Sequence, residues 1–414
     1  MQKINAQTLK GFRDFLPEEA RKRQYVINAL KKVFELYGFE PLETPALEYE
    51  EVLLGKYGEE GDKLMYKFAD QGGRKVAMRY DQTVPLARVV AQYSTLPKPF
   101  KRYQIQNVWR AENTQKGRFR EFLQCDIDTV GISSPNSDAE IVLVTIKALE
   151  KLGFKDFKVL INDRAIFTNL VSEANIDEKN LPKVIRSIDK LKKIGEEGVI
   201  EEIKSNGLSS SQADSALQTI KNLVPTEALE TIFRALENMG VGQEKVQFSP
   251  TLARGLDYYT GMIFEVEIAD YSAGSVTGGG RYDELLGLFS NQSLPAVGCA
   301  FGFDRLLEAM DQLQLFPKDL STTKVLVTVF SNELAEKSTE VASNLRAANV
   351  NTELWLDPES KLDKQLKYAD QKSIPYVVII GPDEVNRNSI VLKNLKSRSQ
   401  QIVTVDEAIK LINN

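Results

Sequence analysis

The sequence of 414 residues contains no histidine. Histidine is the usual general base of Ser-His-Asp and Cys-His catalysis and a common ligand of zinc. Its absence excludes these chemistries and leaves arginine, carboxylate, amide and hydroxyl groups, with any metal held by oxygen. Cysteine is nearly as scarce, because Cys125 and Cys299 are the only two in the chain. Two distant cysteines exclude a disulfide scaffold and a CxxC zinc site, and they are typical of a reducing compartment.

Long apolar runs and a strong basic charge are also missing. No apolar stretch is long enough to span a bilayer, and the first six residues carry no signal or transit pattern. The formal net charge is −5, whereas a protein that coats nucleic acid would be strongly basic. We therefore expect a cytoplasmic protein without a membrane segment, in which any nucleic acid binds to local basic patches.

The length and the 42% of hydrophobic residues indicate two or three globular domains. Apolar residues at helical spacing predict an amphipathic helix over about 18–37, which ends at Gly38. Strands are expected at 75–80 and 100–109, with a helix at 83–93 between them.

Two later stretches differ in character. Residues 170–245 are charged and helix-periodic, which predicts a helical insertion in which Ser211 and Asp214 mark a helix start. Residues 316–323 resemble a linker. Strand-like and helical segments alternate after Lys324 and predict a small α/β domain with a mainly parallel sheet.

The segment 100–131 carries the densest chemistry. Arg110 and Glu112 end one strand, a polar turn follows, and a second strand places Phe122, Gln124 and the two aspartates, Asp126 and Asp128, on one face. A solvated hairpin face would explain the charges alone. It would not explain an aromatic ring among them, whereas a nucleotide site uses a ring for the base and arginine for phosphate.

Two further segments accompany this hairpin. Residues 252–261 contain Arg254, Tyr258 and Tyr259, and they precede Gly278-Gly279-Gly280, where a backbone can approach a ligand closely. Residues 296–305 form a strand of small residues that leads into a helix with Arg305 in its first turn. Taken singly, the glycine run could be a flexible loop and Arg305 a surface residue.

Together these segments resemble histidyl-tRNA synthetases, a family of class II aminoacyl-tRNA synthetases. The hairpin is similar to motif 2, residues 298–305 to motif 3, and the first helix with Pro45 to motif 1. Residues 254–261 and 278–283 are similar to the two motifs peculiar to the histidine enzymes. The resemblance implies a multidomain α/β and α+β protein: an antiparallel-sheet catalytic domain at 1–322, a helical insertion at 170–245, and an α/β anticodon-binding domain at 323–414.

The resemblance also implies a site for ATP, bound in a bent shape with Mg²⁺. Arg110 would hold the α-phosphate, Glu112 the adenine amino group, and Phe122 would stack on the adenine. Arg305 would cover the other side of the base and reach the γ-phosphate. Arg254 would act at the α-phosphate and the substrate carboxylate. Attack of a carboxylate on phosphorus builds negative charge that fixed cations stabilise.

The same resemblance implies a histidine pocket and three partners. Asp81, Thr83 and Gln124 would hold the ammonium group of L-histidine. Asp128 and Tyr259 would bind the two imidazole nitrogens, one a donor and one an acceptor, and Tyr258 would close the pocket. Gln115 would contact the acceptor end of tRNA(His). Motif 1 implies a homodimer.

Other interpretations stay open at this point. The regulatory subunit of ATP phosphoribosyltransferase resembles these enzymes but lacks the anticodon domain, which Lys324–Asn414 would supply here. A sensor domain fused to regulatory partners is a second alternative. The missing histidine has two explanations of its own. Synthesis of a chain without histidine codons would continue when charging with histidine fails, or the absence reflects compositional bias.

Overall fold

The computed structural model describes residues 4–54, 58–114, 118–253, 258–289 and 293–413. The chain forms two compact units, a large unit of residues 1–15 and 23–316 and a small unit of residues 16–22 and 317–414. Within the described residues, no helix has the length and apolar character needed to cross a membrane.

An eight-stranded sheet organises the large unit. Its central strands pair antiparallel, and its two outermost pairs, β1 with β5 and β7 with β8, are parallel. In spatial order the strands are β1 (Glu40–Pro41), β5 (Phe100–Trp109), β6 (Glu121–Val130), β11 (Ala296–Phe301), β10 (Thr277–Arg281), β9 (Met262–Ile268), β7 (Phe157–Asp163) and β8 (Val246–Phe248).

The hairpin of β5 and β6 is the longest pairing in this sheet. It runs from Phe100 opposite Val130 to Trp109 opposite Glu121. Alternation along β6 buries Cys125 and Ile127 in the main core, as the sequence predicts.

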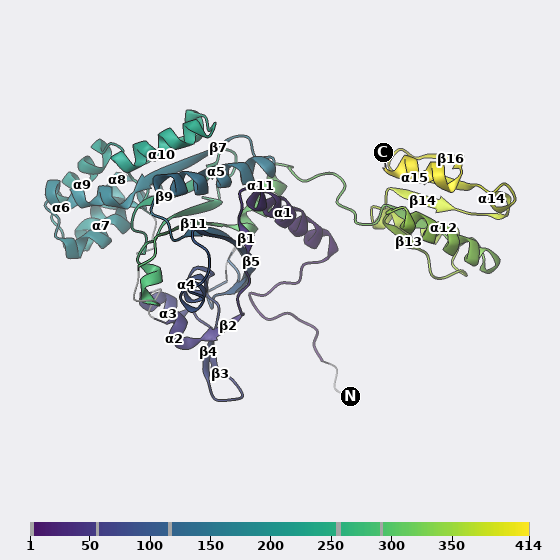
Figure 1. The fold of residues 1–414 in the computed structure, drawn as a ribbon, viewed down its shortest axis with the longest axis horizontal. Helices are drawn as coiled ribbons and strands as arrows, with labels where there is room; N and C mark the ends of the chain where they lie inside the picture. The colour runs from purple at the N-terminus through teal and green to yellow at the C-terminus, as the bar shows by residue number, and fades with distance from the viewer. Residues whose placement is uncertain (1–3, 55–57, 115–117, 254–257, 290–292, 414) are drawn as a thin grey trace. The chain divides into compact units, whose positions relative to one another are not determined.

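Helices cover the sheet and complete the main core. The apolar face of α1 (Pro17–Leu36) packs there through Val26, Leu30 and Phe34. The apolar face of α1 is therefore buried inside the large unit. The other helices of the core are α5 (Pro135–Lys151), α10 (Glu227–Asn238) and α11 (Phe303–Gln312), and α5 packs against α10 (Figure 1).

A smaller three-stranded sheet follows α1. It consists of β2 (Leu47–Tyr49), β4 (Lys75–Met78) and β3 (Lys67–Ala69), in that order. Three helices accompany it: α2 (Glu50–Leu53), α3 (Gly58–Lys63) and α4 (Thr83–Gln92). The turn before α4 is held by Arg79, whose guanidinium donates to the carbonyl oxygens of Thr44 at 2.6 Å and Asn107 at 2.7 Å.

The predicted helical insertion has a core of its own, distinct from the main core. Its helices are α6 (Asn169–Glu173), α7 (Leu181–Ile188), α8 (Leu191–Ser205) and α9 (Ser210–Asn222), with 3-10 turns at 164–168 and 178–180. The helix start predicted at Ser211 and Asp214 is wrong by two residues. Ser209 caps α9 together with Gln212, because the cap residue must lie outside the helix.

The small unit contains a five-stranded sheet in the order β13, β12, β14, β15, β16. The first three strands are parallel, but β15 and β16 form an antiparallel hairpin on β14, so the expectation of a mainly parallel sheet is wrong for that half. The strands are β12 (Val325–Val327), β13 (Thr352–Leu354), β14 (Tyr376–Ile379), β15 (Ile390–Asn394) and β16 (Ser399–Val403), and the helices are α12 (Ala335–Ala347), α13 (Leu362–Gln371), α14 (Pro382–Asn386) and α15 (Val405–Asn413).

Candidate active site

A cavity of about 500 Å³ opens over the large sheet. Most of the predicted site residues line it, although they come from five separate stretches of sequence. They are Asp81, Thr83, Arg110, Glu112, Phe122, Gln124, Tyr258, Tyr259 and Arg305. Asp128 does not line the cavity. Arg254 and Gln115 lie outside the described residues.

Arg110 is held between two aromatic rings. Its Cζ lies 4.5 Å from the ring centroid of Tyr80 and 5.1 Å from that of Phe122, and its Nε donates to the Tyr80 carbonyl oxygen at 3.2 Å. Contacts of this kind restrict the guanidinium without neutralising it. A preorganised cation therefore points into a cavity that can take an anionic substrate.

The start of α11 also lines the cavity, through Phe303, Asp304 and Arg305. Arg305 Nη1 donates to the Ser275 carbonyl oxygen at 2.8 Å, which fixes the direction of an exposed side chain. Glu112 also lines the cavity and forms an ion pair with Arg118 at 3.3 Å. The lining therefore includes both cations and carboxylates, as expected where both phosphate and amine groups bind.

Asp81, Tyr258 and Tyr259 also line the cavity. An Asp81 carboxylate oxygen accepts from the Val84 backbone N–H at 3.2 Å, at the start of α4. The rings of Tyr258 and Tyr259 are 4.8 Å apart, and Tyr282 packs edge-on against Tyr258 at 5.9 Å. The three rings form an aromatic wall, of which Tyr258 and Tyr259 line the cavity.

Asp128 is buried beneath this wall. Its carboxylate forms an ion pair with Arg102 Nη2 at 2.7 Å and accepts a hydrogen bond from the Tyr282 hydroxyl. Burial raises the pKa of Asp128, and the Arg102 charge opposes that rise. The side chain predicted to bind an imidazole nitrogen is therefore engaged by the protein itself.

Asp126 links this buried pair to the cavity. Gln124, which lines the cavity, donates from Nε2 to Asp126 Oδ2 at 2.7 Å. Burial raises the pKa of the Asp126 carboxyl to about 8, although Arg102 lowers it. Arg102 itself is completely buried between the two aspartates.

The glycine run lies in β10, where backbones and side chains crowd together. A Cβ atom on Gly279 would lie 2.0 Å from the Gly298 carbonyl oxygen, and one on Gly298 would lie 2.0 Å from Asp128 Oδ1. Neither position can carry a side chain. Close packing between β10, β11 and β6 is thus the reason for glycine here.

Sequence reasoning missed several residues of the cavity wall, among them Glu265, Phe119 and Asp304. Glu265 faces the cavity from β9, and the signal for it was a charged residue within the otherwise apolar strand 262–266. Asp304 was visible in the motif 3 segment but had no assigned role. Arg102 gave no signal, because a charged residue on a strand ordinarily faces solvent.

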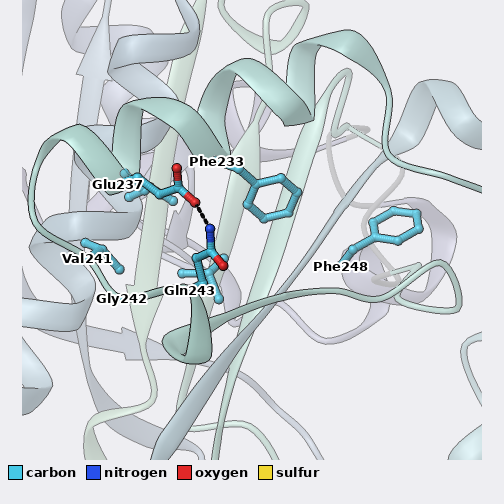
Figure 2. A pocket seen from close by; sticks show the side chains of 8 residues that line it. Phe233, Glu237, Val241, Gly242, Gln243 and Phe248 are labelled. Carbon is cyan, nitrogen blue, oxygen red and sulfur yellow. Dashed lines mark hydrogen bonds between the residues drawn. The ribbon is translucent and has the colours of Figure 1, made fainter.

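A second cavity, of about 300 Å³, lies between α10 and β8. Figure 2 shows Phe233 and Glu237 on α10, with the Gln243 side-chain amide donating to the Glu237 carboxylate and Phe248 nearby. Its lining is mostly apolar and includes none of the predicted site residues.

Comparison with known proteins decides the family. Residues 11–306 match the family model of histidyl-tRNA synthetase, and residues 324–414 match that of an anticodon binding domain. The chain belongs to the histidyl-tRNA synthetase family. A histidine–tRNA ligase of Cytophaga hutchinsonii is 42% identical over 97% of this chain and 98% of the relative, and one of Gloeobacter violaceus is 41% identical over 98% of both.

Solved structures agree with this family assignment. A histidyl-tRNA synthetase from Nostoc superposes with a TM-score of 0.88 at 32% identity, covering 99% of each chain. A Bacillus halodurans structure described as an ATP phosphoribosyltransferase regulatory subunit/histidyl-tRNA synthetase gives a TM-score of 0.74 at 25% identity, covering 89% of this chain and 97% of the other. The predicted fold class, an antiparallel catalytic sheet with a C-terminal α/β domain, is confirmed by these neighbours.

Proposed function

We propose that this chain activates L-histidine with ATP to histidyl-adenylate and transfers the histidyl group to the 3′ end of tRNA(His). One observation carries the proposal. In a member of the histidyl-tRNA synthetase family, the predicted ATP residues and most of the predicted histidine residues line one cavity of about 500 Å³, within the usual range for small-molecule sites.

In the first step the histidine carboxylate attacks the α-phosphorus of ATP, and pyrophosphate leaves. Arg110, held between Tyr80 and Phe122, offers a fixed positive charge to the phosphoryl oxygens. The base would stack on Phe122 next to Glu112, with Arg305 over its other side. Arg254 is the residue proposed to bind the α-phosphate and the substrate carboxylate together.

Mg²⁺ would enter with ATP. Among the described residues, no three histidine, cysteine or carboxylate side chains cluster closely enough to hold a metal ion. Magnesium in such enzymes is commonly bound by phosphate oxygens with one or two carboxylates. Glu265 lines the cavity, has no role at the base, and fits that requirement.

The histidine ammonium group would bind near Asp81, Thr83 and Gln124, and Tyr258 and Tyr259 would enclose the ring. Asp128 would then act from below the wall. Its ion pair with Arg102 offsets its charge, which suits a neutral imidazole better than a cationic side chain. We infer that this pairing favours histidine over lysine and arginine.

The domain assignment follows the same proposal. Residues 1–322 would form the catalytic domain, with 170–245 as its insertion, and 323–414 would bind the anticodon of tRNA(His). The last helix of that range, α10, packs in the main core through Leu229, Ile232 and Leu236. The separate core of the insertion is therefore formed by the helices before α10. Gln115, in the motif 2 turn, would contact the acceptor end.

A homodimer is part of the proposal, formed near motif 1. The apolar face of α1 is buried within the large unit, so the dimer interface would use the surface beside this helix. Leu47, Tyr49 and Tyr93 expose about half of their surfaces around a groove of about 730 Å³ that begins near Pro45. Exposed apolar patches of this kind commonly mark interfaces, and sedimentation should give twice the chain mass.

The decisive experiment is ATP–pyrophosphate exchange with each of the twenty amino acids. We expect exchange that depends on L-histidine, together with charging of tRNA(His). Histidine binding without exchange would favour the alternative, a histidine-binding regulatory subunit.

A further inference from the structure

The segment before α1 contacts two of the segments that line the cavity. We call residues 9–15 the N-terminal strap. The backbone N–H of Arg120 donates to the Gly11 carbonyl oxygen at 2.9 Å, and Arg120 follows Phe119, which lines the cavity. The strap thereby fastens to the end of the motif 2 turn.

Gly11 allows this close approach. Its φ is +90°, and a Cβ atom there would lie 2.7 Å from Arg120 Cγ and 2.8 Å from Thr114 Cγ2. Both the backbone conformation and the space exclude a side chain. The strap therefore lies against the motif 2 turn along a path that few other residues could follow.

Arg13 connects this turn to the opposite wall. Its Cζ lies 3.2 Å from the ring centroid of Phe119, and its Nη2 lies 2.8 Å from an Asp304 carboxylate oxygen. Asp304 also lines the cavity and immediately precedes Arg305. One guanidinium thus contacts both the motif 2 side and the motif 3 side.

The charge of Asp304 explains why the contact matters. A carboxylate on the wall of a cavity that takes a triphosphate repels it, and the repulsion grows in a site shielded from water. Arg13 pairs with one Asp304 oxygen, and Arg23 pairs with the other at 3.2 Å. Both arginines are in turn packed on aromatic rings, Arg13 on Phe119 and Arg23 on Phe15 at 3.8 Å.

We propose that Arg13 is a positioning residue for ATP, which holds Phe119 and Asp304 at a fixed separation and offsets the Asp304 charge. The proposal rests on the proposed function, because it concerns the same ATP site. Arg13 does not line the cavity and is not placed to touch the reacting atoms. It acts through the two walls that it joins.

The test compares Arg13→Ala with Arg234→Ala, an exposed arginine on α10, in the full-length chain. We expect kcat/KM for ATP in pyrophosphate exchange to fall roughly ten- to hundredfold for Arg13→Ala. KM for histidine should stay within about twofold, since Phe119 and Asp304, the two wall residues that Arg13 contacts, are not among the predicted histidine residues. Arg13→Lys should recover part of the loss, and Arg234→Ala should behave as the parent.

A double-mutant cycle with Asp304→Asn separates positioning from general destabilisation. If Arg13 acts through Asp304, the effect of Arg13→Ala on the ATP parameters should be several-fold smaller in the Asp304→Asn background. Equal effects in both backgrounds, or parallel changes in the ATP and histidine parameters, would overturn the proposal. If Arg13→Ala does not fold, Arg13→Lys and the Asp304→Asn variant are compared by the same criteria. A parent chain with no histidine-dependent exchange would instead refute the proposed function.

Discussion

Arg102 lies directly opposite Asp128 across the β5–β6 hairpin, and its Nη2 is 2.7 Å from the Asp128 carboxylate. Both side chains are buried, and Tyr282 donates to the same carboxylate. Contacts connect the pair to the cavity, because Asp126 lies 4.0 Å from Arg102 and accepts a hydrogen bond from Gln124, which lines the cavity. Under the proposed function, this buried charge pair would help to select the amino acid.

Removing the cation from this pair should destabilise the fold strongly. Arg102→Met leaves Asp128 buried without its partner, and such losses typically cost about 3–5 kcal/mol. Urea denaturation followed by circular dichroism measures the change. The double variant Arg102→Met/Asp128→Asn should recover much of the loss, because no unpaired charge remains at that position. A single variant within about 1 kcal/mol of the parent would show that Asp128 takes up a proton or gains water when Arg102 is removed.

Arg110→Ala should leave the fold intact but slow adenylate formation by about 10²–10³. The contacts of Arg110 with Tyr80 and Phe122 fix a cation where charge develops, and truncation removes it. Pyrophosphate exchange gives the rate, and calorimetric titration with histidine alone should change little. Arg110→Lys keeps the charge without the planar group and should lie between the two. Parent-like exchange in Arg110→Ala would assign the phosphate contact to another residue.

The buried carboxyl of Asp126 should make stability depend on pH. Its pKa is raised from 3.8 to about 8, chiefly by burial. The folded state therefore binds this proton more tightly than the unfolded chain. That contribution to stability is complete below about pH 4 and is lost as the pH rises towards 8.

The Asp126→Asn variant has no carboxyl group at this position, so its stability should not fall in this way as the pH rises. Its stability relative to the parent should rise between pH 5 and pH 8, by roughly tenfold or more in the unfolding equilibrium constant. Urea unfolding at each pH unit measures the difference. A constant difference over this range would mean that Asp126 is ionised throughout, with Arg102 outweighing the effect of burial.

Removal of residues after Thr323 should separate the two steps of the reaction. The described cavity residues all precede that point, and the small unit has its own apolar core around Val327 and Val378. Histidine-dependent exchange should remain measurable while charging of tRNA(His) falls sharply. Charging by the full chain should also weaken as salt rises, since phosphate contacts release counterions. Equal charging by both chains would refute this division of labour.

Local patterns in the sequence predicted those elements whose signals are local. The alternation from Phe122 to Asp128 predicted the strand β6 and its buried face, because period two is a property of the strand itself. The hairpin of β15 and β16 was missed because β16 is polar and mostly exposed, so its pairing depends on its neighbour.

The site was harder to predict where tertiary contacts decide a residue's role. The burial of Arg102 gives no signal in the sequence around it. The same holds for the contact between Arg13 and Asp304, which are 291 positions apart in the chain. Asp128 illustrates the same limit. Its place on the polar face was predictable, whereas its engagement by Arg102 depends on which residue lies opposite on β5.

The close packing at Gly279 and Gly298 also bears on how far the substrate range can be altered. A methyl group at either position would collide with backbone or with Asp128. We therefore expect neither glycine to tolerate substitution. If the proposed function holds, variants meant to admit a bulkier or differently charged amino acid would be made at other positions of the pocket, such as Gln124. Libraries for directed evolution should therefore keep Gly279 and Gly298 unchanged.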